Sequence, residues 1–363
     1  MRSIYDNHQQ ITSNGKRIYF AGANTADGFV GVYQDIANEN DLERLYIIKG
    51  GAGTGKSTMM KEIADAAESA GYPVEYYLCG SDPDSLDCVL LDGRIAVLDG
   101  TAPHTLDMNY PGAASELIDV SKFWDKEILE KNRENIIFHS AEKSAAYASA
   151  YRYLRAASAV EKEKAALARQ LFDCEKTGKY VERFVKKLGR IRYRTPSEKH
   201  RWTRAVTMKG RFNLTTLEET SSMYYNVHDN YAAAPIFMCM LRDELLRAGY
   251  SLATAHIPCE NYICGIFIEN CGVSVTVGAR TENSKTIKMT RFARSESAYE
   301  VKAHLRLAAK CAENCMDEAG ARLREAAEQH FALEEIYKTA MDYDRLGQYK
   351  QSVMSEILDR LKK

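Results

Sequence analysis

The first 190 residues alternate short apolar runs with segments whose apolar residues recur at helical spacing. The spacing of Met59, Met60, Ile63, Ala64 and Ala67 predicts a helix, and a turn with a further helix is expected through Phe29–Ala37. The apolar runs predict strands near Arg17–Ala21, Leu45–Lys49, Val74–Leu78, Ile95–Asp99 and Leu117–Val120. Strands that alternate with helices predict an α/β fold with a mainly parallel, three-layer sheet.

The pattern then becomes purely helical. Glu127–Phe172 is rich in Ala, Glu, Lys, Arg and Tyr, and its apolar residues recur about every 3.6 positions. Gly178 is expected to break the helix before a second one at Tyr180–Leu188. A helical hairpin appended to the sheet is therefore predicted, in each of the two copies that the next comparison indicates.

The chain also resembles itself. Leu45–Tyr72 aligns without a gap on Met223–Tyr250, a shift of 178 positions, and both segments end in Ala-Gly-Tyr. The same shift carries Ile95–Gly100 onto Val273–Gly278, and flanking matches occur at shifts of 182 and 169. This pattern predicts a tandem duplication: an active copy at 1–189, a basic linker at 190–200, and a degenerate copy at 201–363.

A phosphate-binding loop follows the strand that ends at Lys49. Residues 50–57 fit the pattern G-x-x-x-x-G-K-[ST], so a bound nucleoside triphosphate, with ATP as the expected one, is predicted. Lys56 would contact the outer phosphates, and the Ser57 hydroxyl would bind Mg²⁺. The predicted nucleotide-contacting residues are Gly50, Gly51, Ala52, Gly53, Thr54, Gly55, Lys56, Ser57 and Thr58.

The second copy lacks this chemistry. Its residues at the positions of the glycines, Lys56, Ser57 and Asp99 are His228, Tyr231, Ala233, Ala234, Pro235 and Val277, which can neither turn as tightly nor counter phosphate charge. It also lacks the nine residues His104–Gly112. We therefore assign that loop to the active site, although ordinary variation in loop length is the alternative.

Asp99 ends an apolar strand where P-loop enzymes place the carboxylate that organises Mg²⁺. A plain Asp-Gly turn is the alternative. The next residue is Gly100, so the glutamate that often activates water is missing. Asp82, Asp84 and His104 are candidate proton acceptors, and helix capping or turn formation is the other interpretation of the two aspartates.

Composition narrows the function classes. The chain has 49 Lys and Arg residues and 50 Asp and Glu residues, so it has no overall positive field that would attract nucleic acid. The basic connector 186–196 could contact nucleic acid, but a solvated linker is favoured. No apolar run spans a membrane, so a cytoplasmic protein is expected. His256, Cys259, Cys264 and Cys271 are irregularly spaced, which favours buried thiols over a zinc site.

The strand, loop and helix with Asp99 resemble the P-loop NTPase superfamily. Segments 20–28, 49–58, 81–85 and 98–104, with Tyr110-Pro111-Gly112, are similar to those of a family of prokaryotic tandem P-loop proteins described as ATPases or ATP-binding proteins. The resemblance covers essentially the whole chain and implies nucleotide contacts at Gly50–Thr58 and Asp99. It implies no substrate.

Three functions are compatible with these residues. The first is an ATPase that couples nucleotide state to a conformational change. The second is a phosphotransferase that uses Asp82, Asp84 or His104 to place a small-molecule or nucleoside hydroxyl. The third is a nucleotide-gated binding protein with little turnover, whose partner, a protein or a small molecule, would bind the second copy.

Overall fold

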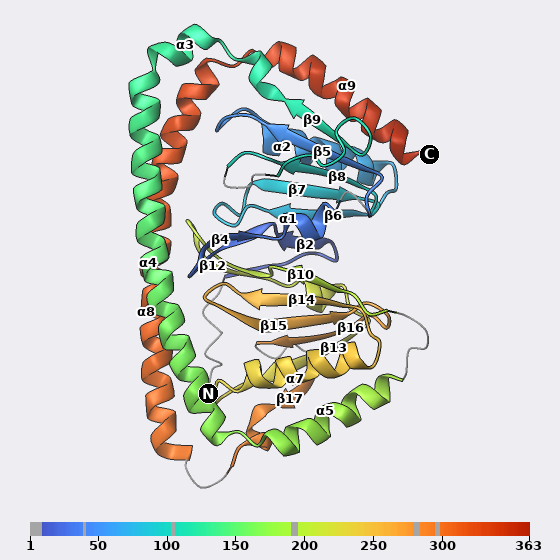
Figure 1. The fold of residues 1–363 in the computed structure, drawn as a ribbon, viewed down its shortest axis with the longest axis vertical. Helices are drawn as coiled ribbons and strands as arrows, with labels where there is room; N and C mark the ends of the chain where they lie inside the picture. The colour runs from blue at the N-terminus through green and yellow to red at the C-terminus, as the bar shows by residue number, and fades with distance from the viewer. Residues whose placement is uncertain (1–8, 39–40, 103–105, 190–194, 279–283, 295–297) are drawn as a thin grey trace.

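The protein contains two six-stranded sheets, shown in Figure 1. The structure, a computed structural model, describes residues 9–38, 41–102, 106–189, 195–278, 284–294 and 298–363. The first sheet has the order β2 (Arg17–Phe20), β6 (Val74–Leu78), β7 (Leu86–Leu91), β8 (Ile95–Asp99), β5 (Arg44–Lys49), β9 (Ser115–Asp119). The second has the order β10 (Glu198–Arg201), β14 (Leu252–Ile257), β15 (Glu260–Ile268), β16 (Val273–Val277), β13 (Met223–His228), β17 (Lys285–Lys288).

Shorter strands and the helices complete the described fold. Two hairpins, β3–β4 and β11–β12, accompany the sheets, and β1 pairs in parallel with β12. These strands are β1 (Gln9–Ile11), β3 (Gly22–Thr25), β4 (Gly28–Gly31), β11 (Arg204–Thr207) and β12 (Gly210–Leu214). The helices are α1 (Tyr33–Ile36), α2 (Lys56–Ser69), α3 (Lys126–Lys131), α4 (Arg133–Leu171), α5 (Cys174–Leu188), α6 (Thr216–Glu219), α7 (Ala234–Arg247), α8 (Ala298–Thr339) and α9 (Tyr343–Leu361), with 3₁₀ turns at Val120–Phe123 and Met289–Phe292.

The first sheet is parallel apart from one inserted strand. Strands β2–β6, β5–β8 and β5–β9 pair in parallel, whereas β7 is antiparallel to both β6 and β8. The predicted α/β class with a parallel-rich sheet is confirmed. Strand β7 was not predicted. Its signal is Asp92-Gly93, where both residues have positive φ and turn the chain back into β8.

Each face of the first sheet is covered. Strand β5 lies between β8 and β9 and is buried on both sides, which explains its unbroken apolar run. On one face, Met59, Met60 and Ile63 of α2 pack with Ile357 of α9. On the other face lie α1 and the β3–β4 hairpin. The expected helix at Phe29–Ala37 is wrong in its first half, because Phe29 lies in β4.

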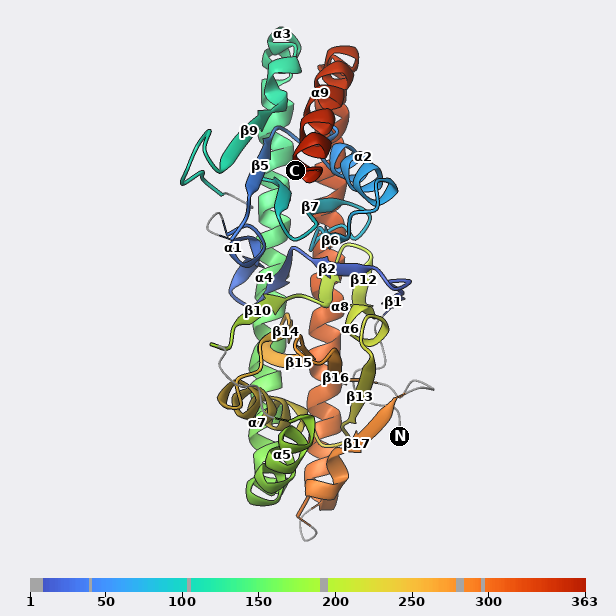
Figure 2. The ribbon, with the colours of Figure 1, turned by 90° about the vertical axis from the view of Figure 1, so that its right-hand side faces the viewer.

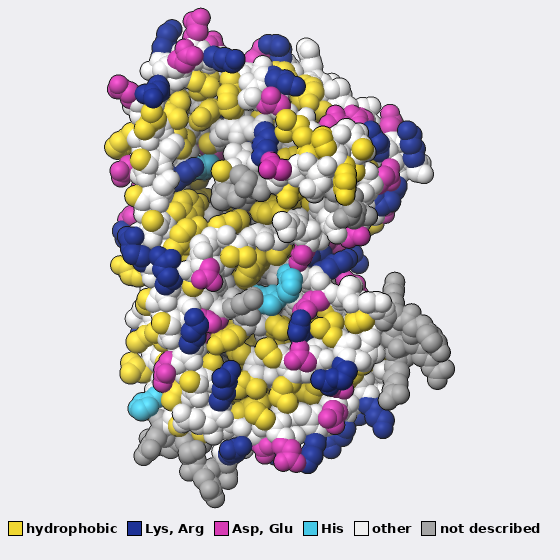
Figure 3. Space-filling view, in the orientation of Figure 1, with side chains coloured by type: hydrophobic (Ala, Val, Ile, Leu, Met, Phe, Trp, Pro, Cys, Tyr) yellow, Lys and Arg dark blue, Asp and Glu magenta, His cyan; other side chains and the backbone are white. Residues whose placement is uncertain are grey.

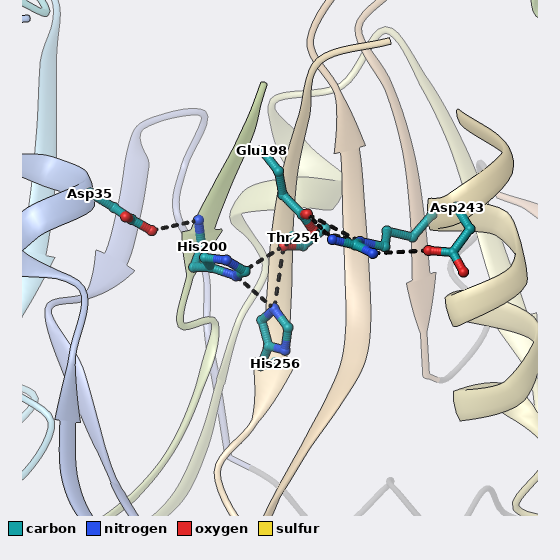
Figure 4. Close-up of polar contacts among 7 residues, drawn as sticks. Asp35, Glu198, His200, Asp243, Thr254 and His256 are labelled. Atoms are coloured by element: carbon teal, nitrogen blue, oxygen red, sulfur yellow. Dashed lines mark hydrogen bonds and ion pairs between the residues drawn. The ribbon is translucent and has the colours of Figure 1, made fainter. Parts of the chain in front are cut away.

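The two sheets meet at their edge strands, β2 and β10, and share a core. The Phe20 N–H donates to the Trp202 carbonyl at 2.8 Å, and both side chains are buried in one cluster that includes Ala255 of the second sheet. Figure 4 shows polar contacts at this boundary: the His200 N–H donates to Asp35 at 3.0 Å, and the His200 ring contacts His256 at 3.1 Å. Part of the predicted linker 190–200 is therefore strand β10, because its backbone pairs with β14.

Helices α4 and α8 lie side by side along the ends of the strands of both sheets (Figures 1 and 2). At about 1.5 Å per residue, 39 and 42 residues span roughly 60 Å each. Small side chains at the contact, Ala150, Ala157 and Ala319, allow the helices to approach closely. Each helix is therefore long enough to carry the chain from one half of the molecule to the other.

The C-terminal helices of the two halves are exchanged as a result. Helix α5 packs on the second half, where Phe184 contacts Tyr225 with ring centroids 5.0 Å apart. Helix α9 packs on the first half, where Tyr46 donates to Glu356 at 2.8 Å. In Figure 1, α9 lies beside β9, and α5 lies beside α7 at the opposite end of the molecule. The expectation of a helical hairpin within each half is wrong, because α4 pairs with α8 instead of with α5.

The corners between these helices explain the exchange. Helix α4 ends at Leu171, just before Phe172, and not at Gly178, which lies inside α5. Phe172 is buried in the core of the second half, and Asp173 caps α5 by accepting from the Lys176 N–H at 2.9 Å. At the other corner, Met341 enters the core of the first half and Asp342 caps α9 in the same way.

Candidate active site

The loop Gly50–Ser57 joins β5 to α2 at the carboxyl edge of the first sheet. Gly53 and Gly55 have φ of +66° and +85°, a backbone region that side chains disfavour. Gly55 immediately precedes α2, so the first N–H groups of this 14-residue helix face the loop. The glycines of the motif therefore stand where the turn requires them.

Lys56 and Asp99 face each other across the loop. The Lys56 ammonium lies 3.6 Å from the Asp99 carboxylate, and it donates to the Gly51 carbonyl at 2.6 Å. Both side chains are largely buried, at 10% and 14% exposed. Asp99 also accepts from the Thr101 N–H at 2.8 Å, and the Thr101 hydroxyl donates to the Gly50 carbonyl at 2.9 Å. These hydrogen bonds join the end of β8 to the phosphate loop.

Ser57 lies at the start of α2, beside the beginning of β7. Its hydroxyl oxygen accepts from the Leu86 N–H at 2.9 Å. Thr54 is buried and donates to the Gly51 carbonyl at 2.9 Å, which holds the middle of the loop, whereas Thr58 is exposed. Ser57 and Asp99 supply hydroxyl and carboxylate oxygens at the same edge of the sheet.

The residue after Asp99 has no room for a side chain. A Cβ atom at Gly100 would lie 2.4 Å from Cγ2 of Ile47 and 3.1 Å from Cε of Lys49. The Lys49 ammonium donates to the Gly100 carbonyl. A glutamate here would have to displace the Ile47 side chain of β5, so packing as well as sequence opposes an acid at this position.

Asp82 and Asp84 form a turn that faces the second half. Asp82 accepts from the Ser85 hydroxyl at 2.8 Å and the Asp84 N–H at 3.2 Å. Lys209, in the β11–β12 turn, pairs with both carboxylates, and the hydrogen bond to Asp84 raises the pKa of Lys209. Asp84 is 76% exposed. These contacts fasten the turn to the other half, and the catalytic role of the two aspartates stays a prediction.

The loop predicted at His104–Gly112 is described only in part. His104 lies outside the described residues. Leu106 and Met108 pack against the core that the two sheets share. The Arg44 guanidinium donates to the carbonyls of Gly112 and Ala113 at 2.8 and 3.0 Å. The far end of the loop is therefore tied to the start of β5.

The corner between α8 and α9 lies against the phosphate loop, although these residues are about 290 positions away in the chain. A Cβ atom at Gly51 would lie 2.8 Å from the Tyr337 ring, and one at Gly53 would lie 3.0 Å from Glu334. The Tyr343 hydroxyl donates to the Gly53 carbonyl at 3.1 Å. Sequence reasoning missed this corner because no local motif marks it.

In the second half a carboxylate occupies the start of the corresponding helix. Asp229 is fully buried and accepts from the N–H groups of Ala234 at 2.8 Å and Tyr231 at 3.0 Å. Burial raises the pKa of Asp229, and the hydrogen bonds from Ala234 and Tyr231 oppose that shift. The N–H groups that bind phosphate in a P-loop are thus satisfied here by the chain's own side chain.

The comparisons agree with the loop geometry. A family model described as an AAA domain matches residues 32–80. This match supports a P-loop nucleotide-binding domain of the AAA type in the first half of the chain. It ends before β8, so Asp99 and the whole second half lie beyond it. No curated protein and no solved structure matches the chain significantly.

Metal-ligating groups, membrane spans and surface charge complete the description of the described residues. No group of three or more His, Cys, Asp or Glu side chains there could hold a metal ion. His256, Cys259 and Cys264 are buried. No helix that the structure describes is long and apolar enough to cross a bilayer. On the face shown in Figure 3, basic and acidic side chains are interspersed.

Proposed function

We propose that the protein is an ATPase that binds one Mg-ATP in its first half and couples the nucleotide state to movement of the α8–α9 corner. The observation that carries this proposal is the loop Gly50–Ser57, in which Lys56 faces Asp99 at the end of β8. In the structure the Lys56 ammonium bonds to carbonyl oxygens of its own loop. Phosphate oxygens would replace those contacts with stronger, charge-assisted ones.

The residues present fit Mg²⁺. This ion prefers oxygen ligands and typically takes only one or two from the protein, with phosphates and waters completing the set. Ser57 would bind it through its hydroxyl, and Asp99 would hold a water on it. When bound, the ion neutralises charge on the phosphates. The chain's own contribution is to hold the phosphates with the loop N–H groups and Lys56.

We also infer that the two halves arose by tandem duplication, with 1–189 and 201–363 as the copies. The sheet orders support this: β2-β6-β7-β8-β5-β9 and β10-β14-β15-β16-β13-β17 correspond strand by strand in chain order. The position of Asp229 supports a second copy that binds no triphosphate, because an anionic side chain already satisfies the helix start.

The contacts at the two ends of α8 support movement of the α8–α9 corner. Glu334 and Tyr337 touch the phosphate loop, while Leu305, near the other end of α8, packs against Ala232 in the second-half loop. One helix therefore contacts both loops. A change of loop shape on phosphate binding would be transmitted along α8, because packed helices move as rigid elements.

The test is Lys56→Ala, with Lys310→Ala, an exposed lysine of α8, as the matched control. We expect Lys56→Ala to weaken ATP binding by roughly a hundredfold in calorimetry, because a charge-assisted contact is lost. The variant should still fold, since no core side chain is removed, but it should melt at a lower temperature without nucleotide, because Asp99 loses its largely buried partner. Wild-type ATP affinity in Lys56→Ala would reject the site. Unchanged hydrogen exchange at 334–346 on addition of Mg-ATP would reject the coupling.

A phosphotransferase is the second candidate, and Gly100 favours it. Packing against Ile47 opposes the glutamate that would activate water, so a substrate hydroxyl could take the place of water. Phosphate release by the wild type with ATP alone supports the ATPase. Release of ADP only when pooled metabolites are added supports the transferase, and tight ATP binding with neither supports a nucleotide-gated binding protein.

A further inference from the structure

Helix α4 presents one row of side chains to the carboxyl edge of the first sheet. The Tyr147 hydroxyl donates to the Ser81 hydroxyl oxygen at 3.0 Å, and the Tyr151 hydroxyl donates to Asn24 at 3.3 Å. Residues four apart lie on the same helix face. Lys143 is one turn before Tyr147, so it faces the same edge of the sheet.

Lys143 lies one turn from Tyr147 toward the start of α4, which is beside β9 in Figure 1, and therefore toward β8, β5 and the phosphate loop that follows β5. Its pKa is lowered, first by burial and then by the positive charge of Lys56. Among the residues that the structure describes, no carboxylate forms an ion pair with Lys143, whereas Lys56 has Asp99 at 3.6 Å. Burial and a neighbouring like charge both disfavour an ammonium group. Among the described residues Lys143 thus has no anionic partner, and an anion placed beside it would offset both the burial of its ammonium and the repulsion from Lys56.

A third lysine lies at the same edge of the sheet. Lys49 ends β5 immediately before the loop, and its ammonium bonds to the Gly100 carbonyl, which is a neutral partner. Lys49, Lys56 and Lys143 come from a strand, from the start of α2 and from the long helix α4, so three separate elements bring ammonium groups to one edge of the sheet. The outer phosphates of a triphosphate carry the negative charge that matches this arrangement.

We propose that Lys143 is a catalytic residue of this site and that its ammonium contacts the terminal phosphate of the nucleotide held by the loop. This inference rests on the proposed function. P-loop lysines reach the β- and γ-phosphates, and Lys143 lies near Lys56, at that end of the nucleotide. A cation that reaches the terminal phosphate from outside the loop stabilises the charge that develops during transfer. Helix α4 thereby links the site to its partner helix α8.

The experiment compares Lys143→Met and Lys143→Arg with Arg152→Met, which removes an exposed charge from the same helix. Calorimetry measures ATP and ADP binding with Mg²⁺, and phosphate release measures turnover. We expect Lys143→Met to weaken ATP binding about tenfold and ADP binding less than twofold, because ADP lacks the γ-phosphate. Turnover should fall at least a hundredfold, and Lys143→Arg should recover part of it.

Thermal melting without nucleotide separates a catalytic role from a structural one. Because Lys143 is a partly buried charge, Lys143→Met should melt at the wild-type temperature or above it. Three results would each overturn the role of Lys143 while leaving the proposed function standing. They are a lower melting temperature, equal losses of ATP and ADP affinity, and wild-type turnover. Failure of the wild type to bind either nucleotide would overturn the proposed function as well.

Discussion

Replacing Ile357 with alanine tests the exchange of the C-terminal helices. Ile357 lies on α9, only a few residues from the end of the chain, yet it is fully buried in the core of the first half with Met60 and Ile63 of α2. The substitution removes three carbons, worth about 0.8 kcal/mol each, and leaves a cavity. The total expected loss is about 3 kcal/mol, within the range for Ile→Ala in a core.

Hydrogen exchange followed by mass spectrometry shows where that loss falls. A loss of about 3 kcal/mol should speed exchange through local opening by roughly a hundredfold. We expect the faster exchange in β5 and α2, not in β13 and α7, although α9 directly follows the second half in sequence. Ser355→Ala, on the exposed face of α9, should leave exchange unchanged.

The complementary variant is Val185→Ala on α5, which is buried in the second-half core. It should speed exchange in β13 and α7, although α5 belongs to the first half of the sequence. If Ile357→Ala instead affected only the second sheet, or neither sheet, the placement of α9 on the first half would be refuted.

Two other predictions concern the nucleotide site. Equilibrium titration should give one ATP per chain, because Asp229 already satisfies the start of α7; two equivalent sites would contradict this. Shortening the His104–Gly112 loop to the length found in the second half, or His104→Ala, should lower turnover about a hundredfold, the scale of a lost acid or base. Melting temperature and ATP affinity should stay unchanged in those variants; one that unfolds would make the loop structural, and one with normal turnover would make it dispensable.

The candidate site could be predicted only where a local sequence pattern marks its residues. The loop at 50–57 has a fixed pattern because consecutive backbone N–H groups must face the phosphates, and Asp99 could be found because it ends a strand of the same sheet. Tyr337, Tyr343 and Lys143 carry no such pattern. Tyr337 and Tyr343 reach the loop, and Lys143 faces the same edge of the sheet, only because α4 and α8 run along the strand ends.

The sequence by itself determined the α/β class, most of the strands and the phosphate loop, because each depends on local periodicity or on a turn that only glycine allows. Tertiary structure alone decided which half each C-terminal helix covers. Both α5 and α9 are amphipathic, and either could cover either sheet as far as pattern shows. The lengths of α4 and α8 determine which sheet each helix covers. Phe172 and Met341 also contribute, because they enter the core of the opposite half at the corners. Packing over roughly 60 Å of helix cannot be read from local sequence.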